Sequence, residues 1–169
     1  RGRGIVICAG GVEYFTNAWV CINMLRRLGC KLPIQLWHLG PHELDGHMKS
    51  LVAALEVECV DAEDVRGRSP CKGLAGWALK PYAIIHSPFR EVLLLDADNV
   101  PLIDPEELFE QHPYLETGAV FWPDFGRMDP GRPAWRVFGV PFRHEPEFET
   151  GQVLVDKRRC WIPLWLTMW

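Results

Sequence analysis

The amino-acid sequence predicts an α/β domain in which helices flank a mainly parallel sheet. Short apolar runs alternate along the chain with segments whose apolar residues recur every three or four positions, and this alternation is typical of βαβ units. Residues 92–95 form an unbroken aliphatic run, as expected for a strand that is buried on both faces. Because the chain has 169 residues, 48% of them hydrophobic, and shows no internal repeat, we expect one domain over residues 1–169.

The first part of the chain is expected to alternate three strands with two helices. Apolar content predicts strands at residues 4–9, 34–39 and 57–60. The face of the first helix would carry Phe15, Trp19, Ile22, Leu25 and Leu28, and Gly29 would end that helix. The face of the second helix would consist of Leu44, Met48, Leu51 and Leu55. The polar, glycine-containing residues 61–76 indicate a loop.

The second part of the chain continues the alternation with a longer connection. Residues 77–86 are expected to form a helix with Pro81 near its first turn, followed by a buried strand at residues 91–95. Asp104, followed by proline and two glutamates, is typical of a helix start, and this helix should run to about Gln111. Further strands are expected at residues 119–122 and 148–155. Between them, residues 123–146 predict a long ordered loop with a short helix near residues 134–138.

Charge and hydropathy exclude two classes of partner. Lys and Arg number 18 and Asp and Glu number 22, for a net charge of −4. Because the basic residues form no single block, a nucleic-acid partner is not expected. No apolar run reaches the ~18 to 20 residues of a membrane-spanning helix. Any contact with a membrane is therefore expected only through an anchor upstream of these residues.

The six cysteines match no zinc-binding spacing. They are Cys8, Cys21, Cys30, Cys59, Cys71 and Cys160. We expect most of them to be free thiols, because a chain of this length can build a core without covalent links. One or two disulfides are the alternative.

The last ten residues are unusually apolar. Residues 160–169 contain three tryptophans together with Ile162, Leu164, Leu166 and Met168. Such a segment either packs onto the domain or belongs to an interface whose partner surface lies outside these residues. The second interpretation is favoured.

Two aspartates that follow the most apolar strand are the strongest candidates for chemistry. Asp96 and Asp98 stand at the expected carboxyl end of that strand, where open α/β sheets bind ligands. Two carboxylates at this spacing can converge on one hard cation such as Mn²⁺ or Mg²⁺. A cation there would bridge the phosphates of a diphosphate and neutralise the charge that develops as they leave. The alternative is that Asp96 caps the following turn and Asp98 is merely solvated.

Several segments, in order along the chain, resemble one enzyme family. The strand ending in Asp96-Ala97-Asp98, preceded by Trp77-Ala78-Leu79-Lys80-Pro81-Tyr82 and followed by Pro101-Leu102, resembles the D-x-D glycosyltransferases of the GT-A fold. With GIVICAGG at residues 4–11, LRRLGCKLPI at 25–34 and ETGQVLVDK at 149–157, the sequence is most similar to the α-mannosyltransferases of glycosyltransferase family 71. The resemblance implies a GT-A-like, Rossmann-like fold. It also implies a metal-dependent, retaining transfer of a hexose, most likely mannose from GDP-mannose, from a nucleoside-diphosphate sugar to a glycan or glycoprotein acceptor.

The resemblance also implies roles for individual residues. Asp96 and Asp98 would hold Mn²⁺ or Mg²⁺, with Asp96 also beside the donor diphosphate. Further donor-binding residues would be Ala9, Gly10 and Gly11 in the first strand-to-helix loop, Lys80, and Trp122, Asp124, Thr150 and Gly151 around the sugar. Glu149 and Gln152 are the candidate catalytic residues. Simpler alternatives stay open: a tight turn at the glycine pair, a solvated Lys80, core packing of Trp122 and a β-bulge at Gly151.

The resemblance is incomplete at the carboxyl end. Glycosyltransferases of this type usually supply a third metal ligand and acceptor-side residues downstream of the segment matched by residues 149–152. These residues have no counterpart in the sequence, so we expect it to be a truncated fragment of a longer catalytic domain. The family resemblance alone further implies a Golgi-lumen location within a membrane-anchored protein.

Two other functions are compatible with parts of the sequence. A fragment of a glycosyltransferase could bind a nucleotide or sugar without turning it over. In addition, Asp96-Ala97-Asp98-Asn99-Val100 fits the D-x-D-x-[TV] pattern of haloacid-dehalogenase-like phosphohydrolases. In that case Asp96 would be the nucleophile and Asp98 the acid/base. That family carries the motif on its first strand, whereas nearly a hundred residues precede it here.

Overall fold

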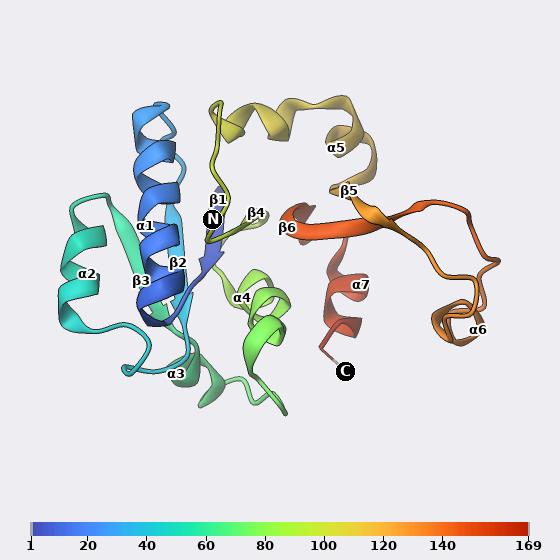
Figure 1. The fold of residues 1–169 in the computed structure, drawn as a ribbon, viewed down its shortest axis with the longest axis horizontal. Helices are drawn as coiled ribbons and strands as arrows, with labels where there is room; N and C mark the ends of the chain where they lie inside the picture. The colour runs from blue at the N-terminus through green and yellow to red at the C-terminus, as the bar shows by residue number, and fades with distance from the viewer. Residues whose placement is uncertain (1, 169) are drawn as a thin grey trace.

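A computed structural model describes residues 2–168 and contains a six-stranded sheet with helices on both faces (Figure 1). The strands are β1 (Arg3–Cys8), β2 (Ile34–His38), β3 (Val57–Asp61), β4 (Glu91–Asp96), β5 (Ala119–Arg127) and β6 (Pro146–Asp156), in the spatial order β3-β2-β1-β4-β6-β5. The first four run parallel, and β6 runs antiparallel to both β4 and β5. The prediction of an α/β fold with a mainly parallel sheet is confirmed.

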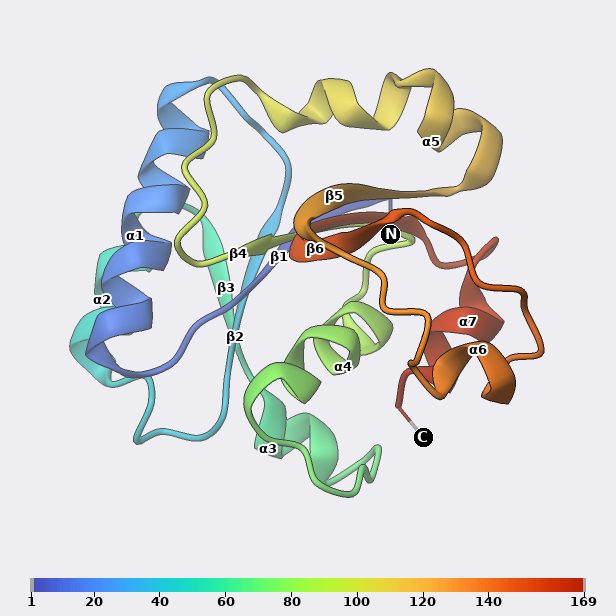
Figure 2. The same ribbon diagram turned by 45° about the vertical axis from the view of Figure 1, so that its right-hand side comes forward.

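Two apolar clusters fill the space between the sheet and its helices, whose arrangement is drawn in Figure 2. One face is covered by α1 (Gly11–Arg27) and α2 (Gly46–Ala53), together with the 3₁₀ helix η2 (Pro105–Glu110) and α5 (His112–Thr117). The other face is covered by α3 (Ala62–Arg66), α4 (Leu79–His86) and α7 (Trp161–Leu166), with the 3₁₀ turn η1 (Gly76–Ala78) leading into α4. Because both faces are covered, the central strands β1 and β4 are apolar almost throughout.

Side-chain caps explain where several helices begin. The carboxylate of Asp104 accepts a hydrogen bond from the amide of Glu106 (3.0 Å), as predicted for this helix start. Asp61 similarly caps α3 by accepting from the amide of Glu63 (2.9 Å). The prediction of a loop at residues 61–76 is therefore partly wrong, because α3 lies within this segment. The short helix α5 was also not predicted.

The helical faces were predicted only in part. Trp19 and Leu51 were expected to be buried but are 38% and 40% exposed. Ala18 and Val52, each next to one of them in sequence, are fully buried instead. The prediction was based on the largest apolar residues. Which side chains are buried depends instead on which side of each helix faces the sheet.

The last two strands extend into a region that was expected to be a loop. They form a long antiparallel pair that projects from the edge of the sheet and carries α6 (Ala134–Val137) at its far end (Figure 1). The short helix predicted near residues 134–138 is confirmed. Trp122 and Asp124 were expected at the end of a strand, but they lie within β5.

All six cysteines are free thiols, as we expected for most of them.

The apolar carboxyl-terminal segment is divided between two environments. Leu164 and Met168 pack against a core cluster, while Trp161, Ile162, Trp165 and Leu166 are 41% to 72% exposed. Trp169, the last of this segment, lies outside the described residues. Within the part of the chain that the structure describes, none of the helices combines the length and apolar character needed to cross a membrane.

Candidate active site

The topology gathers the predicted site residues at one edge of the sheet. The parallel strands β1 and β4 end side by side, with Cys8 paired to Asp96. Strand β6 runs in the opposite direction, so its first half lies at the same edge, and Gln152 is paired with Leu95. The first strand-to-helix loop, the D-x-D motif and residues 149–152 therefore meet at the carboxyl ends of the parallel strands, where such sheets bind ligands.

An ion pair between α4 and β4 lies at the centre of this edge. The ammonium of Lys80 is 2.6 Å from Oδ1 and 2.8 Å from Oδ2 of Asp96. It also lies 3.3 Å from the carbonyl oxygen of Thr150 in β6. The two charged side chains are 17% and 29% exposed. Lys80 is thus not a solvated surface lysine, because it links the helix, the D-x-D strand and β6.

Cys8 lies beneath this ion pair. Burial raises the pKa of its thiol to about 12, with Asp96 adding to the rise and Lys80 opposing it. The thiol therefore stays protonated at neutral pH. Its role at the site is to fill space next to the charged pair, since only the thiolate is a strong nucleophile.

A β-bulge brings the backbone of β6 against Asp96. Along β5, the neighbours Phe121 and Trp122 pair with Val153 and Glu149, so three residues of β6, 150–152, have no partner in β5. A Cβ atom built on Gly151 would lie 3.5 Å from Oδ2 of Asp96 and only 2.9 Å from a carboxylate oxygen of Glu149. The bulge that was considered as a simple alternative is present, and bulges of this kind are common beside active sites.

Hydrogen bonds fix the bulge in place. The amide of Gly151 donates to the carboxylate of Glu149, and the side-chain amide of Asn99 donates to the carbonyl oxygen of Gly151 (2.7 Å). Sequence reasoning gave Asn99 no separate role. The only sequence signal for a role of Asn99 is its position directly after the D-x-D motif, because its hydrogen-bond partner lies 52 residues further along the chain.

The glycine pair after β1 packs against a neighbouring loop. The amide of Gly11, a residue with φ of 73°, donates to the carbonyl oxygen of Glu43 (2.8 Å). The carboxylate of Glu43 accepts from the amide of Leu39 (2.6 Å) and lies directly over Gly10, where a Cβ would come within 2.1 Å of it. The tight-turn interpretation accounts for Gly11, and the close approach of the Glu43 side chain accounts for Gly10. The donor-binding role of Ala9, Gly10 and Gly11 stays a prediction.

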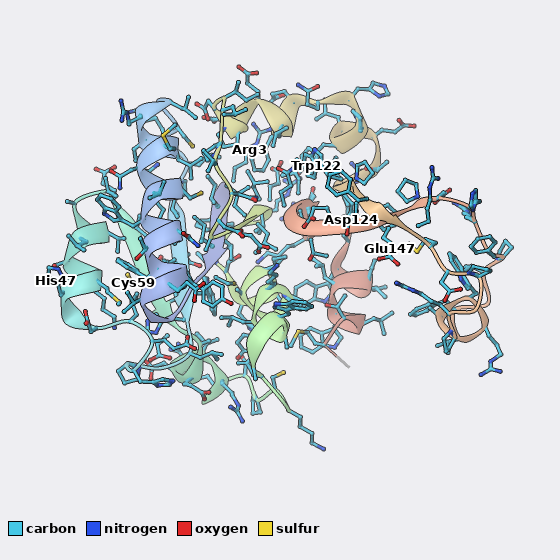
Figure 3. All side chains as sticks on the ribbon, viewed as in Figure 1. Arg3, His47, Cys59, Trp122, Asp124 and Glu147 are labelled. Carbon is cyan, nitrogen blue, oxygen red and sulfur yellow. The ribbon has the colours of Figure 1, made fainter. Side chains whose placement is uncertain are left out.

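A hollow of about 390 Å³ lies at the same edge, on the face of the sheet that η2 and α5 cover, and neither Lys80 nor Asp96 is among the residues that line it. Residues 99–103 and 105 line one side, and Trp122, Glu149, Gly151 and Gln152 are also in its wall. Trp122 packs against the core as well, so the core-packing interpretation is confirmed, and its contact with the sugar stays a prediction. The carboxylate of Asp124, labelled with Trp122 in Figure 3, accepts from the amide of Phe125 (2.6 Å). The apolar loop with the exposed Leu102 and Ile103 was missed as part of the site.

The two carboxylates at this edge suit a cation that is also coordinated by water and substrate phosphates. Asp98 is exposed in the turn after β4, and Asp96 is the only other predicted metal ligand. No group of three or more His, Cys, Asp or Glu side chains within residues 2–168 is arranged to hold a metal ion. Mg²⁺, and by the same oxygen chemistry Mn²⁺, commonly binds through one or two carboxylates and completes its shell with water and substrate phosphates. The two aspartates fit that mode of binding.

The fold is that of the GT-A glycosyltransferases. Among solved structures, the bifunctional glycosyltransferase WbbM superposes with a TM-score of 0.66, at 16% identity, over 96% of this chain and 32% of its own. The galactosyltransferase LgtC in complex with donor and acceptor sugar analogues superposes with a TM-score of 0.55, at 14% identity, over 92% of this chain and 58% of its own. At these identities the likeness concerns the fold.

Sequence comparison specifies the family. A family model described as "Mannosyltransferase putative" matches residues 2–133, and the chain belongs to this mannosyltransferase family. Alpha-1,2-mannosyltransferase MNN2 of Saccharomyces cerevisiae is 33% identical over an alignment of 132 positions, which covers 75% of this chain and 22% of the yeast protein. The chain spans about a fifth to a quarter of the length of the curated relatives it matches.

Proposed function

We propose that the chain forms the donor-binding part of an α-mannosyltransferase that transfers mannose from GDP-mannose to a glycan or glycoprotein acceptor. One observation carries the proposal: Lys80 and Asp96 meet the bulged segment of β6 at the carboxyl edge of the sheet, with Asp98 in the turn that follows β4, in a chain of the mannosyltransferase family. A nucleoside-diphosphate sugar requires groups that bind its phosphates next to groups that bind its sugar. This edge offers both.

The charged residues suit the diphosphate. Lys80 supplies an ammonium that can bind a phosphate oxygen and stabilise the charge of the leaving nucleoside diphosphate. Asp96 and Asp98 are the residues that would hold Mn²⁺ or Mg²⁺ together with the phosphates. When bound, such a cation neutralises the negative charge that accumulates on the leaving group.

The polar residues in the wall of the hollow suit the sugar. Glu149 and Gln152 bring a carboxylate and an amide to this wall, where they can accept from and donate to sugar hydroxyls. Trp122 adds an aromatic face at the same hollow. We propose Glu149 and Gln152 as the residues that orient the sugar for transfer.

A donor-binding function without turnover is the second candidate. It is favoured because no group of three or more His, Cys, Asp or Glu side chains within residues 2–168 is arranged to hold a metal ion. The haloacid-dehalogenase-like alternative has lost its support, because the chain belongs to a mannosyltransferase family. The location in the Golgi lumen stays a prediction.

Calorimetric titration of the purified chain tests the proposal. GDP, UDP, GDP-mannose and p-nitrophenyl phosphate are each titrated with Mn²⁺ and with a chelator. We expect GDP and GDP-mannose to bind in the presence of Mn²⁺, and p-nitrophenyl phosphate not to bind. A separate assay for release of GDP from GDP-mannose distinguishes transfer or hydrolysis from binding alone.

The substitution Asp98→Ala should weaken Mn²⁺-dependent GDP binding by about tenfold or more, because it removes one of two carboxylates that attract the cation. The fold should be intact, since Asp98 is exposed in a turn. Asp64→Ala, which removes an exposed carboxylate on α3, is the matched control and should bind like the unsubstituted chain. Equal GDP affinity of the Asp98→Ala variant with and without Mn²⁺, at the level of the unsubstituted chain, would contradict the proposal.

A further inference from the structure

We infer that Lys80 is an internal counter-ion of the D-x-D motif, which withholds Asp96 from free divalent cations until a diphosphate binds the ammonium in its place. The inference rests on the proposed function and adds an order of binding to it. The cation would enter together with the nucleotide rather than before it.

The geometry of the ion pair leaves little of Asp96 for a free cation. The ammonium of Lys80 lies within 2.8 Å of both carboxylate oxygens of Asp96. A cation bound by Asp96 would have to share or displace this contact. With Lys80 in place, the two aspartates and the lysine together carry a net charge of −1 rather than −2, which weakens the attraction for Mn²⁺.

The ammonium can exchange one set of acceptors for another. It has three N–H donors, and the structure gives it three acceptor oxygens: two on Asp96 and the carbonyl oxygen of Thr150. The phosphates of a nucleotide would offer charged oxygens in place of these contacts. The pair is partly exposed, so a diphosphate can reach the ammonium, and its charged oxygens would compensate for the contacts that are lost.

The surroundings of the pair are less able to move than the lysine. Asp96 ends a buried strand, and Gly151 is held beside it by the hydrogen bond from Asn99 (2.7 Å). Lys80 is instead joined to α4 by a flexible four-carbon stem. A change of partner at this site is therefore a movement of the lysine side chain, and it leaves the carboxylate in position.

A purely structural role of Lys80 predicts a different result. If Lys80 served only to tie α4 to β6, the substitution Lys80→Met would loosen the edge and weaken the binding of every ligand there. A counter-ion predicts effects of opposite sign, because the same ammonium opposes a cation and attracts a diphosphate. One substitution therefore separates the two roles.

The experiment measures Mn²⁺ binding without nucleotide, by electron paramagnetic resonance of free Mn²⁺, and GDP binding with Mn²⁺, by calorimetry. We expect Lys80→Met to bind Mn²⁺ about tenfold more tightly than the unsubstituted chain, since one repelling charge is removed. We expect its affinity for GDP to fall by about tenfold. In the unsubstituted chain, GDP should increase the affinity for Mn²⁺.

Two further variants complete the test. Lys80→Met/Asp98→Asn should lose the gain in Mn²⁺ affinity, which places the bound cation at the D-x-D motif. Lys31→Met, which removes an exposed lysine ahead of β2 at the other edge of the sheet, should leave both affinities unchanged.

Unchanged or weaker Mn²⁺ binding by Lys80→Met would overturn the counter-ion role, as would an equal gain in Lys31→Met. The proposed function would survive that result if the unsubstituted chain bound GDP with Mn²⁺. Failure of the unsubstituted chain to bind GDP under any condition would instead remove the proposed function, and with it the diphosphate as the partner that releases Asp96.

Discussion

The two edges of the sheet carry similar charged side chains but place them in different surroundings. At the carboxyl edge, the paired side chains of Lys80 and Asp96 are 17% and 29% exposed. At the amino edge of β4, Arg90 pairs with Asp156 at 2.9 Å, and 46% of the Arg90 side chain but only 6% of the Asp156 side chain is exposed. Although burial opposes it, hydrogen bonds from Arg90 and the amide of Arg158 hold the pKa of Asp156 below its usual value.

Lys157 shows the contrast most clearly. Its ammonium donates to the carbonyl oxygens of Ile84 (3.1 Å), Ile85 (3.2 Å) and Ser87 (2.7 Å), and so satisfies the carboxyl end of α4. Burial lowers the pKa of Lys157 to about 8, so the ammonium still carries its proton at neutral pH. Lys80 lies on the same helix as these carbonyls, yet it binds a carboxylate that is open to ligands.

The difference indicates that one edge holds the fold together and the other is free to exchange partners. A buried charge whose donors are all used by the protein contributes to stability, and removing it leaves its partners without hydrogen bonds. A partly exposed ion pair contributes little. Stability and ligand binding should therefore respond to different lysines.

The largest expected effect on stability follows from Lys157→Met. We expect it to lower the free energy of unfolding by about 2 to 4 kcal/mol, because the last carbonyls of α4 lose their donor. Lys80→Met should change that free energy by less than about 1 kcal/mol. Urea denaturation followed by circular dichroism measures both. Similar losses in the two variants would show that the edges do not differ in this way.

A second prediction concerns a glycine at the carboxyl edge. Gly10→Ala should lower the free energy of unfolding by about 1 to 3 kcal/mol, because the new methyl group meets the Glu43 side chain. Backbone strain does not contribute, since φ of −140° at Gly10 is open to any residue. The same denaturation experiment measures the loss.

The double variant Gly10→Ala/Glu43→Ala identifies the cause. If the clash accounts for the loss, the double variant should be more stable than the sum of the two single effects predicts. Strict additivity would mean that Gly10 is needed for another reason, of which contact with the nucleotide is the one that the sequence suggested.

The fold could be predicted well because its main signals are local. The aliphatic run of β4 is long and is followed at once by Asp96 and Asp98, so strand, strand end and site position could all be recognised together. The cap at Asp104 was equally local. By contrast, α3 has only five residues, too few for a periodic pattern, and its capping residue Asp61 also accepts from the amide of Gly40 (3.0 Å) across the sheet.

The contacts within the site could not be predicted in the same way. The pairing of Lys80 with Asp96 joins residues 16 positions apart, and Asn99 reaches Gly151 across 52 positions. No periodicity relates such residues, because the order of strands in the sheet brings them together. The family resemblance implied a position of Lys80 near the donor phosphates. Its pairing with the carboxylate of Asp96 could be seen only in the three-dimensional structure.

The smallest predicted effect concerns pH and again belongs to the amino edge. His86, at the end of α4, is half-buried, and its ring centroid lies 4.2 Å from that of Tyr82. Burial, and then the charge of Lys157, lower the pKa of His86 below 6.5. The unfolded chain therefore binds a proton at His86 more readily than the folded chain, so this residue reduces stability as the pH falls below about 6.5.

His86→Gln should remove this contribution, because glutamine does not titrate. Between pH 7.5 and 5.5, we expect the variant to lose less of its free energy of unfolding than the unsubstituted chain, as measured by urea denaturation at each pH. Lys157→Met removes the second cause and should reduce the pH dependence without abolishing it. A larger acid loss in His86→Gln would reverse the sign and show that the charged imidazole is stabilised by the fold. The amino edge would then accommodate a second positive charge next to Lys157. That result would contradict the proposed difference between the two edges of the sheet.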